Sequence, residues 1–343
     1  MTQTPATYDV CAVGNAIVDV LAPCDPAFLD AQGLTPGSMQ LVDAAQSAAL
    51  YAAMKPGVEA SGGSAGNTVA GVGAFGGRAA YVGKVADDTL GGVFSHDIRA
   101  AGVAFDTPPL KDGAAAGLAT GVCMINVTDD GQRTMCTFLG AANQLEPEDI
   151  DADLIAASEI LYLEGYLFDP APARAAFEAA AAAAHAAGRK VAITLSDTFV
   201  VARWRAELLA FIETSADIVF ANEAELIALF DSPHGTPGFK EASEELARRV
   251  AVAAITRGAE GSVILSGDQV VAVAAFPVDK VLDTTGAGDQ YAAGVLLGLA
   301  RGLSFEDAGK LGSLAAAEVI AHWGPRPMTS LEALARKAGL TLA

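Results

Sequence analysis

The residues best suited to chemistry lie in one short run near the C-terminal end of the chain, DTTGAGD at 283–289. Its slim members Gly286, Ala287 and Gly288 let backbone N–H groups approach an anion closely, and the start of a helix adds partial positive charge. Asp289 would lie beside that anion, where a carboxylate can take a proton from an attacking hydroxyl. The run therefore suits phosphoryl transfer. The plain alternative is that Asp289 only caps the following helix.

A glycine-rich motif earlier in the chain, SGGSAGNT at 61–68, is a candidate for binding hydroxyl groups. Its glycine pair precedes a helical pattern and allows a ligand to approach the backbone closely. Asn67 offers both a donor and an acceptor. A tight strand-to-helix turn would explain the same residues.

Two motifs in the second half of the chain are candidates for contacts to a nucleotide and its metal ion. NEAE at 222–225 follows a predicted strand and opens a helix, and Glu225 could organise water around Mg²⁺, which prefers oxygen ligands. Its alternative is an ordinary helix start with acids in the first turn. TRGAEG at 256–261 places Thr256 and Arg257 where they could contact a phosphate. The alternative is that this motif is only a hairpin turn between two strands.

Other sequence features exclude several classes of protein. GVGAFG at 71–76 matches GxGxxG, but it ends a helical pattern and leads into a strand, the reverse of a dinucleotide-binding fold. No GxxxxGK[ST] run exists, so a P-loop is excluded. The four cysteines and four histidines lack the spacing of a zinc site or a disulfide framework.

Composition limits the partners and the location. The formal net charge is −20, which argues against nucleic acid as a partner because phosphate backbones need clustered Lys and Arg. No run of about 18 apolar residues is present, so no membrane partner is expected. The polar N-terminal residues 1–9 have no basic and apolar signal regions, and we expect a cytoplasmic location.

Short apolar runs alternate with longer helical patterns, which predicts an α/β fold with a doubly wound, mostly parallel sheet and helices on both faces. Strands are expected at 10–13, 79–82, 160–164, 190–195, 218–221, 253–256 and 262–265. Helices are expected at 66–75, 89–101, 171–187, 223–230, 289–301 and 305–321. Two β-rich segments interrupt this rhythm, 19–42 and 116–141, and we expect them to form a small lid. The core would then comprise 1–18, 43–115 and 142–343.

Taken in order, the four motifs resemble the ribokinase-like (PfkB) family of carbohydrate and nucleoside kinases. The resemblance runs from about residue 8 to about residue 327, and both stretches that serve as family signatures, 62–92 and 283–296, are present. It implies a doubly wound α/β core with a β-sheet lid over the acceptor. It also implies transfer of the ATP γ-phosphoryl group to a hydroxymethyl oxygen with Mg²⁺.

The resemblance assigns roles to individual residues. Asp289 would be the catalytic base, with the amides of Gly286, Ala287 and Gly288 as the anion hole. Residues near the first strand and the glycine pair would hold the acceptor hydroxyls: Asn15, Ile17, Asp19, Gly63 and Asn67. The ATP site would include Asn222, Thr256, Arg257, Gly258, Gly261, Thr284 and Ser313. Glu225 would act on Mg²⁺ through water, and a monovalent cation such as K⁺, common in the family, would bind close to Asp283.

The lid segments look most like those of adenosine kinases. By that resemblance a purine would be enclosed by Gln40, Cys123, Met135, Leu139, Leu167 and Phe199, and Arg133 would reach the transferring phosphate when the lid closes. We therefore expect a nucleoside acceptor, adenosine, phosphorylated at its 5′-hydroxyl in purine salvage. A ribose- or fructose-like sugar is the alternative acceptor. A further alternative, a non-catalytic nucleotide-binding regulator, is disfavoured because such a protein has no need of both Asp289 and Glu225. A monomer and a homodimer are both compatible with the sequence.

Overall fold

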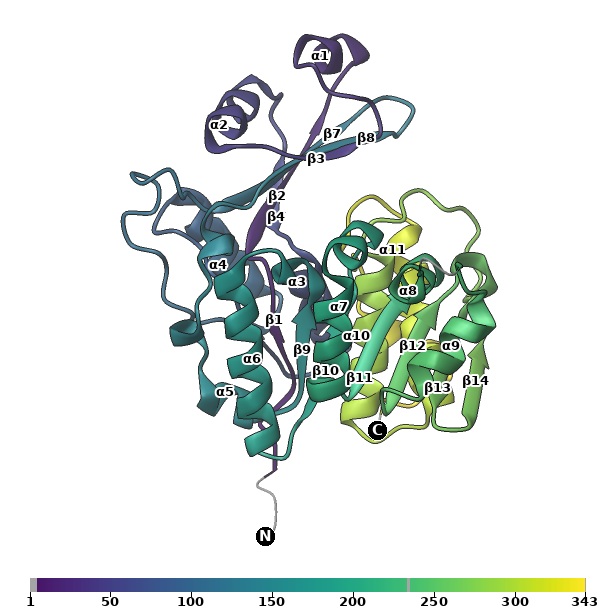
Figure 1. The fold of residues 1–343 in the computed structure, drawn as a ribbon. Helices are drawn as coiled ribbons and strands as arrows, with labels where there is room; N and C mark the ends of the chain where they lie inside the picture. The colour runs from purple at the N-terminus through teal and green to yellow at the C-terminus, as the bar shows by residue number, and fades with distance from the viewer. Residues whose placement is uncertain (1–4, 233–234, 343) are drawn as a thin grey trace.

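The computed structural model describes residues 5–232 and 235–342, and two β-sheets organise this part of the chain (Figure 1). The main sheet has, in spatial order, β14 (Gln269–Val273), β13 (Ser262–Ser266), β12 (Val252–Thr256), β11 (Ile218–Asn222), β10 (Lys190–Thr194), β9 (Ser158–Glu164), β1 (Tyr8–Val13), β5 (Ala79–Val82) and β6 (Val103–Ala104). Among these described strands, β13 pairs antiparallel with both β12 and β14, and the other neighbouring strands pair parallel. The expected α/β fold class is confirmed.

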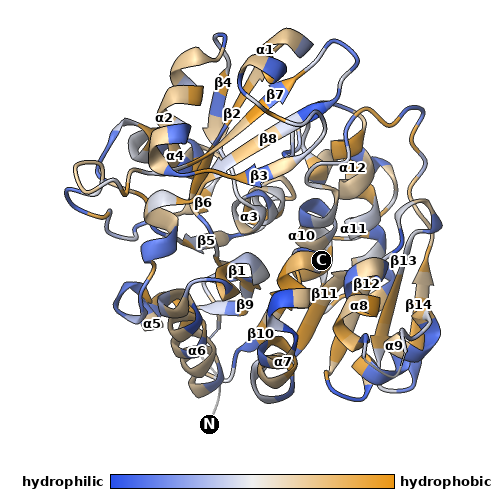
Figure 2. Cartoon of the chain, turned by 45° about the horizontal axis from the view of Figure 1, so that its top comes forward, coloured by the Kyte–Doolittle hydropathy of each residue, from blue (hydrophilic) through white to orange (hydrophobic). Residues whose placement is uncertain are grey.

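Helices cover both faces of the main sheet because its strands are apolar on both sides. In β1, Val10 and Ala12 belong to one hydrophobic cluster, whereas Cys11 and Val13 belong to the other. The first face packs against α3 (Ser64–Ala74), α4 (Thr89–Ala100), α10 (Ala287–Ala300), α11 (Phe305–Ile320) and α12 (Leu331–Lys337). The second packs against α5 (Ala152–Ala156), α6 (Ala171–Ala186), α7 (Thr198–Ser215), α8 (Glu223–Phe230) and α9 (Phe239–Ala247). Figure 2 shows β11 and β12 as hydrophobic and parts of α5 and α9 as hydrophilic.

The smaller sheet stands above one end of the main sheet (Figure 1). Its order is β3 (Met39–Leu41), β8 (Arg133–Phe138), β7 (Gly121–Val127), β2 (Ile17–Pro23) and β4 (Val58–Ser61). Two helices, α1 (Pro26–Ala31) and α2 (Ala44–Ala53), cover one face, where Leu29 and Leu50 join the cluster that holds Val18 and Met124.

This small sheet is larger than the two segments expected for the lid. The expected core range 43–115 includes α2 and β4, yet β4 pairs antiparallel with β2 in the small sheet. The pairing satisfies the backbone groups of an edge that β2 would otherwise leave open. Short 3₁₀ helices complete the described elements: η1 (Gly140–Gln144), η2 (Pro147–Asp149), η3 (Gly165–Phe168) and η4 (Gly258–Glu260).

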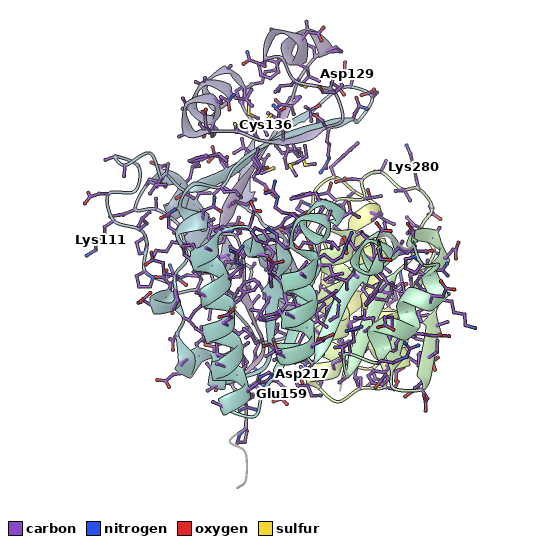
Figure 3. All side chains as sticks on the ribbon, in the orientation of Figure 1. Lys111, Asp129, Cys136, Glu159, Asp217 and Lys280 are labelled. Carbon is purple, nitrogen blue, oxygen red and sulfur yellow. The ribbon has the colours of Figure 1, made fainter. Side chains whose placement is uncertain are left out.

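The order of the strands creates a natural binding crevice. The chain places β5 on one side of β1 and β9 on the other, so the sheet grows in opposite directions from this point. Ligands of such sheets bind at the carboxyl ends of the strands near that reversal. Figure 3 shows Asp129 of the β7–β8 turn and Lys280 of the β14–α10 loop at this end, and Glu159 and Asp217 at the opposite end.

Most expected elements agree with the structure to within two residues. The helix expected from residue 66 begins at Ser64, and the one expected from 289 begins at Ala287. Among residues 5–232 and 235–342, no helix has both the length and the apolar character needed to cross a bilayer.

Candidate active site

Asp289 lies in the first turn of α10, directly after a sharp turn at Gly286. Gly286 is the N-cap residue and has a φ of +77°, a left-handed conformation that favours glycine. A Cβ atom at this position would lie 2.5 Å from the carbonyl oxygen of Pro325. The alternative in which Asp289 is the N-cap is therefore wrong, and its carboxylate is free to face another part of the molecule.

That carboxylate faces the first turn of α3. Ser64 Oγ donates to Asp289 Oδ1 at 2.6 Å, and Asn67 Nδ2 donates to Oδ2 at 3.2 Å. Burial raises the pKa of Asp289 to about 6, and the bonds from Ser64 and Asn67 oppose the increase. A carboxylate with a pKa slightly below neutral is ionised at pH 7 and is still a competent proton acceptor.

The turn before Asp289 presents backbone donors. Among the described residues, the N–H groups of Gly286 and Gly288 find no hydrogen-bond acceptor. The third amide expected in the anion hole, that of Ala287, donates to the carbonyl of Thr284 at 3.2 Å. A Cβ atom on Gly288 would meet nothing within 4 Å, so this residue borders open space.

Asn15 and Glu164 meet across β1 and β9 at the reversal point of the main sheet. Asn15 Nδ2 donates to Glu164 Oε1 at 2.8 Å, and Ala65 N donates to Oε2 at 2.9 Å. Asn15 Oδ1 is buried and has no partner in the described part of the chain, which leaves an acceptor for a ligand hydroxyl. Sequence reasoning did not select Glu164, although an acid at the end of a buried strand was a usable signal.

Asp19 brings the small sheet into the same site. A Cβ atom on Gly62 would lie 2.3 Å from Asp19 Cγ, so glycine is required for the carboxylate to sit against this backbone. Burial raises the pKa of Asp19 to about 7, and the charge of Asp289 adds to the increase while Arg326 and Arg133 oppose it. Asp19, which we expect to hold acceptor hydroxyls, therefore lies directly against the glycine pair at 62–63.

The face of the small sheet that carries Asp19 is apolar. Ile17, Cys123, Ile125 and Ala142 form a separate hydrophobic cluster, with Met135 packed against it. Gln40 lies on the opposite face, because it is in register with Cys136, and its Nε2 lies 3.6 Å from Cys136 Sγ. Its expected place beside a purine is therefore wrong: neighbouring residues of a strand point to opposite faces.

A second correction concerns Leu167. This side chain is fully buried in the hydrophobic cluster beneath α6 and α7, so it cannot border a ligand. The neighbouring Tyr166 instead places its ring 6.0 Å from the ring of Phe199, and Phe199 is 41% exposed. Leu139 is partly exposed at the start of η1.

Arg133 connects the small sheet to the loop before α10. Its guanidinium forms an ion pair with Asp283, donates to Thr285 Oγ1 at 3.0 Å, and lies 5.4 Å from the ring centre of Trp323. Asp283 also accepts from the backbone N–H groups of Thr285 and Gly324, both at 3.0 Å. Arg133 thus reaches the edge of the turn at 284–288.

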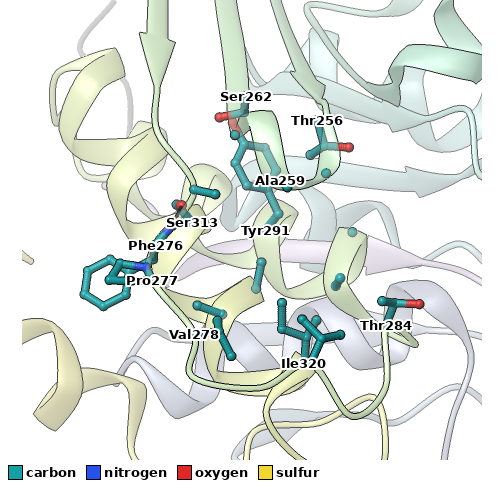
Figure 4. Close-up of a pocket in the computed structure, with 18 residues that line it drawn as sticks. Thr256, Ala259, Ser262, Phe276, Pro277, Val278, Thr284, Tyr291, Ser313 and Ile320 are labelled. Carbon is teal, nitrogen blue, oxygen red and sulfur yellow. Dashed lines mark hydrogen bonds between the residues drawn. The ribbon is translucent and has the colours of Figure 1, made fainter.

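A cavity of about 490 Å³ opens on the other side of that turn (Figure 4). Five of the residues expected at an ATP site line it: Thr256, Gly258, Gly261, Thr284 and Ser313. Ser313 Oγ accepts from Phe276 N at 2.8 Å and donates to Ala274 O at 2.9 Å, which fixes one wall. Gly288 also lines this cavity.

Arg257 does not line the cavity. It pairs with Glu223 at 2.9 Å and Glu260 at 2.8 Å, and its guanidinium stacks 4.3 Å above the ring centre of Phe239. Its expected contact with a phosphate is therefore not supported, because its charge is already engaged on the outside of the sheet.

Asn222 and Glu225 form a capping box at the start of α8, which agrees with the alternative of an ordinary helix start with acids in its first turn. Glu225 also lines a small cavity of about 180 Å³ together with Asp289 and Thr256. Burial raises the pKa of Glu225 to about 7. The described residues contain no group of three or more His, Cys, Asp or Glu side chains that could hold a metal ion.

Two residues beyond the recognised motifs complete the site. Gln290 is fully buried, and its Nε2 donates to the carbonyls of Asn67 and Pro325, both at 3.0 Å. Arg326 donates to Asn67 Oδ1 at 3.2 Å. Arg326 stands between Pro325 and Pro327, and a lone arginine in such a rigid segment was the available sequence signal.

Comparison with known proteins agrees with this geometry. A family model described as pfkB family carbohydrate kinase matches residues 39–331. The crystal structure of adenosine kinase from Sinorhizobium meliloti is 51% identical, with a TM-score of 0.88 over 97% of this chain and 100% of that chain. The structure of a probable sugar kinase protein from Rhizobium etli is 47% identical, with a TM-score of 0.89 over 98% and 100%.

A relative with a different described substrate is also similar. Probable fructokinase-6, chloroplastic, from Arabidopsis thaliana is 29% identical over 259 residues. The match covers 72% of this chain and 64% of the fructokinase, so this chain spans less than two thirds of that protein.

Proposed function

The chain belongs to the pfkB family of carbohydrate kinases and is thus a phosphotransferase with an alcohol acceptor, and we propose that its acceptor is the 5′-hydroxyl of a nucleoside, adenosine, with ATP as donor. The observation that carries this choice is the 51% identity, over nearly the full length of both chains, to the protein described as adenosine kinase. The apolar face of the small sheet supports it, because a flat purine base gains from apolar contact.

In this proposal Asp289 is the base. Its carboxylate takes the proton of the 5′-hydroxyl while that oxygen forms a bond to the γ-phosphorus. The bond from the γ-phosphorus to the β,γ-bridging oxygen breaks, and ADP leaves. Such a reaction needs positioning and charge stabilisation more than covalent help. The hydrogen bonds from Ser64 and Asn67 supply the positioning, because they fix both carboxylate oxygens.

The anion-binding turn supplies the charge stabilisation. The free N–H groups of Gly286 and Gly288, at the positive end of α10, would bind the transferring phosphoryl group. Arg133 would add positive charge once a phosphate replaces Asp283 as its partner. The 490 Å³ cavity beyond Gly288 has the position and the apolar walls for the adenine and ribose of ATP.

The residues present fit Mg²⁺ bound through ATP. Glu225 borders the same small cavity as Asp289, and a carboxylate at this place would hold the ion through water. Without a three-carboxylate cluster in the described chain, phosphate oxygens and water would provide most ligands. Bound Mg²⁺ neutralises charge on the β- and γ-phosphates.

While Arg133 remains paired with Asp283, this carboxylate has little capacity left to bind a K⁺ ion directly. Both oxygens of that carboxylate accept backbone hydrogen bonds, and Arg133 is its ion-pair partner. We therefore include no monovalent cation in the proposed reaction.

A sugar kinase acting on a ribose- or fructose-like acceptor is the second candidate. It is favoured by the likeness to the Rhizobium etli probable sugar kinase protein and to the plant fructokinase. Asp19 and Asn15, which would bind hydroxyls, suit either acceptor.

One experiment separates these candidates. The purified protein is incubated with ATP and Mg²⁺ against a panel of nucleosides and sugars, and products are identified by mass spectrometry, with Asp289→Asn as the control. We expect adenosine 5′-monophosphate, with kcat reduced about 10³-fold or more in Asp289→Asn. Turnover of fructose or ribose without nucleoside turnover would rule out the adenosine proposal. Undiminished activity of Asp289→Asn would rule out the base.

A further inference from the structure

Arg326 contacts three separate elements of the fold close to Asp289. Its Nε donates to Asn67 Oδ1 at 3.2 Å, and its Nη1 donates to Ser61 Oγ at 2.6 Å and to Asp97 Oδ2 at 3.1 Å. Ser61 ends β4, Asn67 is in α3, and Asp97 is in α4. The guanidinium is largely buried and is held by these three directed hydrogen bonds, while its Nη2 has no partner among the described residues, and this arrangement indicates a specific role for its orientation.

The chemistry of these groups fixes the Asn67 amide in one orientation. A guanidinium can only donate, so the oxygen of the amide must face Arg326. The Nδ2 group must then face Asp289, where it donates to Oδ2 at 3.2 Å. If the amide turned over, its oxygen would face a carboxylate oxygen, and the two acceptors would repel each other.

Asp97 and Ser61 hold the guanidinium in place. Asp97 Oδ2 accepts from Ser61 N at 2.8 Å and from Ser61 Oγ at 2.5 Å, in addition to Arg326. The chain of contacts therefore runs from Asp97 through Arg326 and Asn67 to Asp289.

We propose that Arg326 is a positioning residue: it locks the Asn67 amide so that Asn67 donates to Asp289 and keeps this carboxylate oriented as a proton acceptor. The proposal rests on the proposed role of Asp289 as the base.

The surroundings of Asp289 define the direction of the effect. Polar and charged groups from several elements face it: Ser64 and Asn67 of α3, Asp19 of β2, Tyr162 and Glu164 of β9, Tyr166 of η3, and Arg326. Burial raises the pKa of Asp289, whereas Ser64, Asn67 and the charge of Arg326 lower it. Loss of Arg326 removes its own positive charge and the fixed orientation of the Asn67 amide, and both favour the ionised carboxylate of Asp289.

The test compares pH profiles of Arg326→Lys and Arg326→Gln with those of a matched variant, Arg301→Gln. Arg301 pairs with Asp9 at 3.2 Å at the opposite end of β1, and its side chain is 22% exposed against 17% for Arg326. In Arg326→Gln, the acid limb of kcat/KM should move upward by about one pH unit, which is about a tenfold loss on that limb. Arg326→Lys should shift it less, and Arg301→Gln should leave it in place.

A merely structural role would lower activity by the same factor at every pH, or would move the profile equally in Arg301→Gln. Either result would overturn the proposal. Addition of Asn67→Ala separates action through the amide from action of the charge alone. If Arg326 acts through Asn67, the shift caused by Arg326→Lys, which keeps the charge, should vanish in the Asn67→Ala background. If Arg326→Lys still moved the acid limb by the same amount in the Asn67→Ala background, the proposal would be overturned.

A readout without turnover distinguishes this failure from failure of the proposed function. The Asp289 carboxyl carbon is followed by ¹³C NMR titration, and its signal is assigned by its absence in Asp289→Asn. We expect a higher titration midpoint in Arg326→Gln than in the wild type and in Arg301→Gln. Unchanged midpoints would overturn the positioning role even in an active kinase. A shifted midpoint in a protein that phosphorylates no acceptor would support the positioning of Asp289 and reject the kinase assignment.

Discussion

Ser64 and Asp289 are joined by a 2.6 Å hydrogen bond although 225 positions separate them in the chain. The bond brings the first turns of α3 and α10 face to face. The close approach of the two helices requires glycine at position 71, because a Cβ atom there would lie 2.2 Å from Gln290 Oε1 and 2.8 Å from Ala293 Cβ. The glycine pattern at 71–76, which suggests a nucleotide loop in other contexts, here belongs to helix packing.

Substitution of the two glycines around Ala287 should have opposite effects on stability. Gly286→Ala places a Cβ atom against Pro325 in a left-handed conformation, and we expect a loss of about 1–3 kcal/mol in the free energy of unfolding. Gly288→Ala projects its methyl group into open space within a helix and should be neutral or slightly stabilising. Urea denaturation monitored by circular dichroism measures both.

The Gly288→Ala variant should lose activity although it retains its stability. The methyl group of Gly288→Ala would occupy the border of the 490 Å³ cavity, so kcat/KM for ATP should fall about 100-fold while the fold is retained. Wild-type turnover in this variant would contradict the placement of the phosphates at Gly288.

The two acids in the first turn of α8 should differ in their effect on Mg²⁺ dependence. Glu225 borders the cavity shared with Asp289, whereas Glu223 pairs with Arg257. Glu225→Gln keeps a side-chain acceptor for the capping box. The Mg²⁺ concentration for half-maximal rate should therefore rise about tenfold in Glu225→Gln, and not in Glu223→Gln. Equal responses of the two variants would argue against a role for Glu225 at the metal ion.

Two aromatic side chains of similar exposure should report on different substrates. Phe199 is 41% exposed beside Tyr166, and Phe276 is 39% exposed at the 490 Å³ cavity. Phe199→Ala should raise KM for adenosine about tenfold with KM for ATP unchanged, because stacking on a base is lost. Phe276→Ala should do the reverse. Steady-state kinetics with each substrate varied in turn would decide, and an identical pattern in both variants would mean that neither ring contacts a base.

The unliganded protein should lose stability as pH rises through the weakly acidic range. Burial raises the pKa of Asp19, Glu164 and Glu225 to about 7 and that of Asp289 to about 6. The folded state then holds protons that the unfolded state releases, so the stabilising contribution is complete below about pH 4 and is lost by about pH 7. Thermal unfolding at pH 5.5 and pH 8.0 measures this change.

Glu164→Gln should reduce that pH dependence and should raise the free energy of unfolding at pH 8 by on the order of 1–3 kcal/mol. Asn15 can turn its amide so that the unpartnered Oδ1 accepts from the new side chain. The exposed Glu178 of α6 provides the control, and Glu178→Gln should leave the slope unchanged. A slope in Glu164→Gln as steep as that of the wild type would show that Glu164 does not carry the effect.

Local patterns were sufficient to predict most of the elements. Alternating apolar runs and helical periods predicted the α/β class, and the helix expected at 305–321 is observed at Phe305–Ile320. The small sheet was harder to predict, because β4 is a short exposed strand whose only signal is its pairing with β2. The resemblance to adenosine kinases placed Gln40 beside a purine, whereas its register with Cys136 puts it on the other face of the sheet. The side-chain period of a strand is two, so a one-residue error in register reverses the face.

The sequence alone determined the local chemistry: a glycine turn at 286 with free amides, an acid in the following helical turn, and a capping box that ends in Glu225. These features depend on neighbours within a few residues. Tertiary structure decided what faces Asp289, namely Ser64, Asn67 and, through Asn67, Arg326. It also decided the raised pKa of that carboxyl group, because burial is produced by segments more than 200 residues away in the chain. Periodicity and spacing contain no information about such long-range neighbours, which only the packing of α3 against α10 defines.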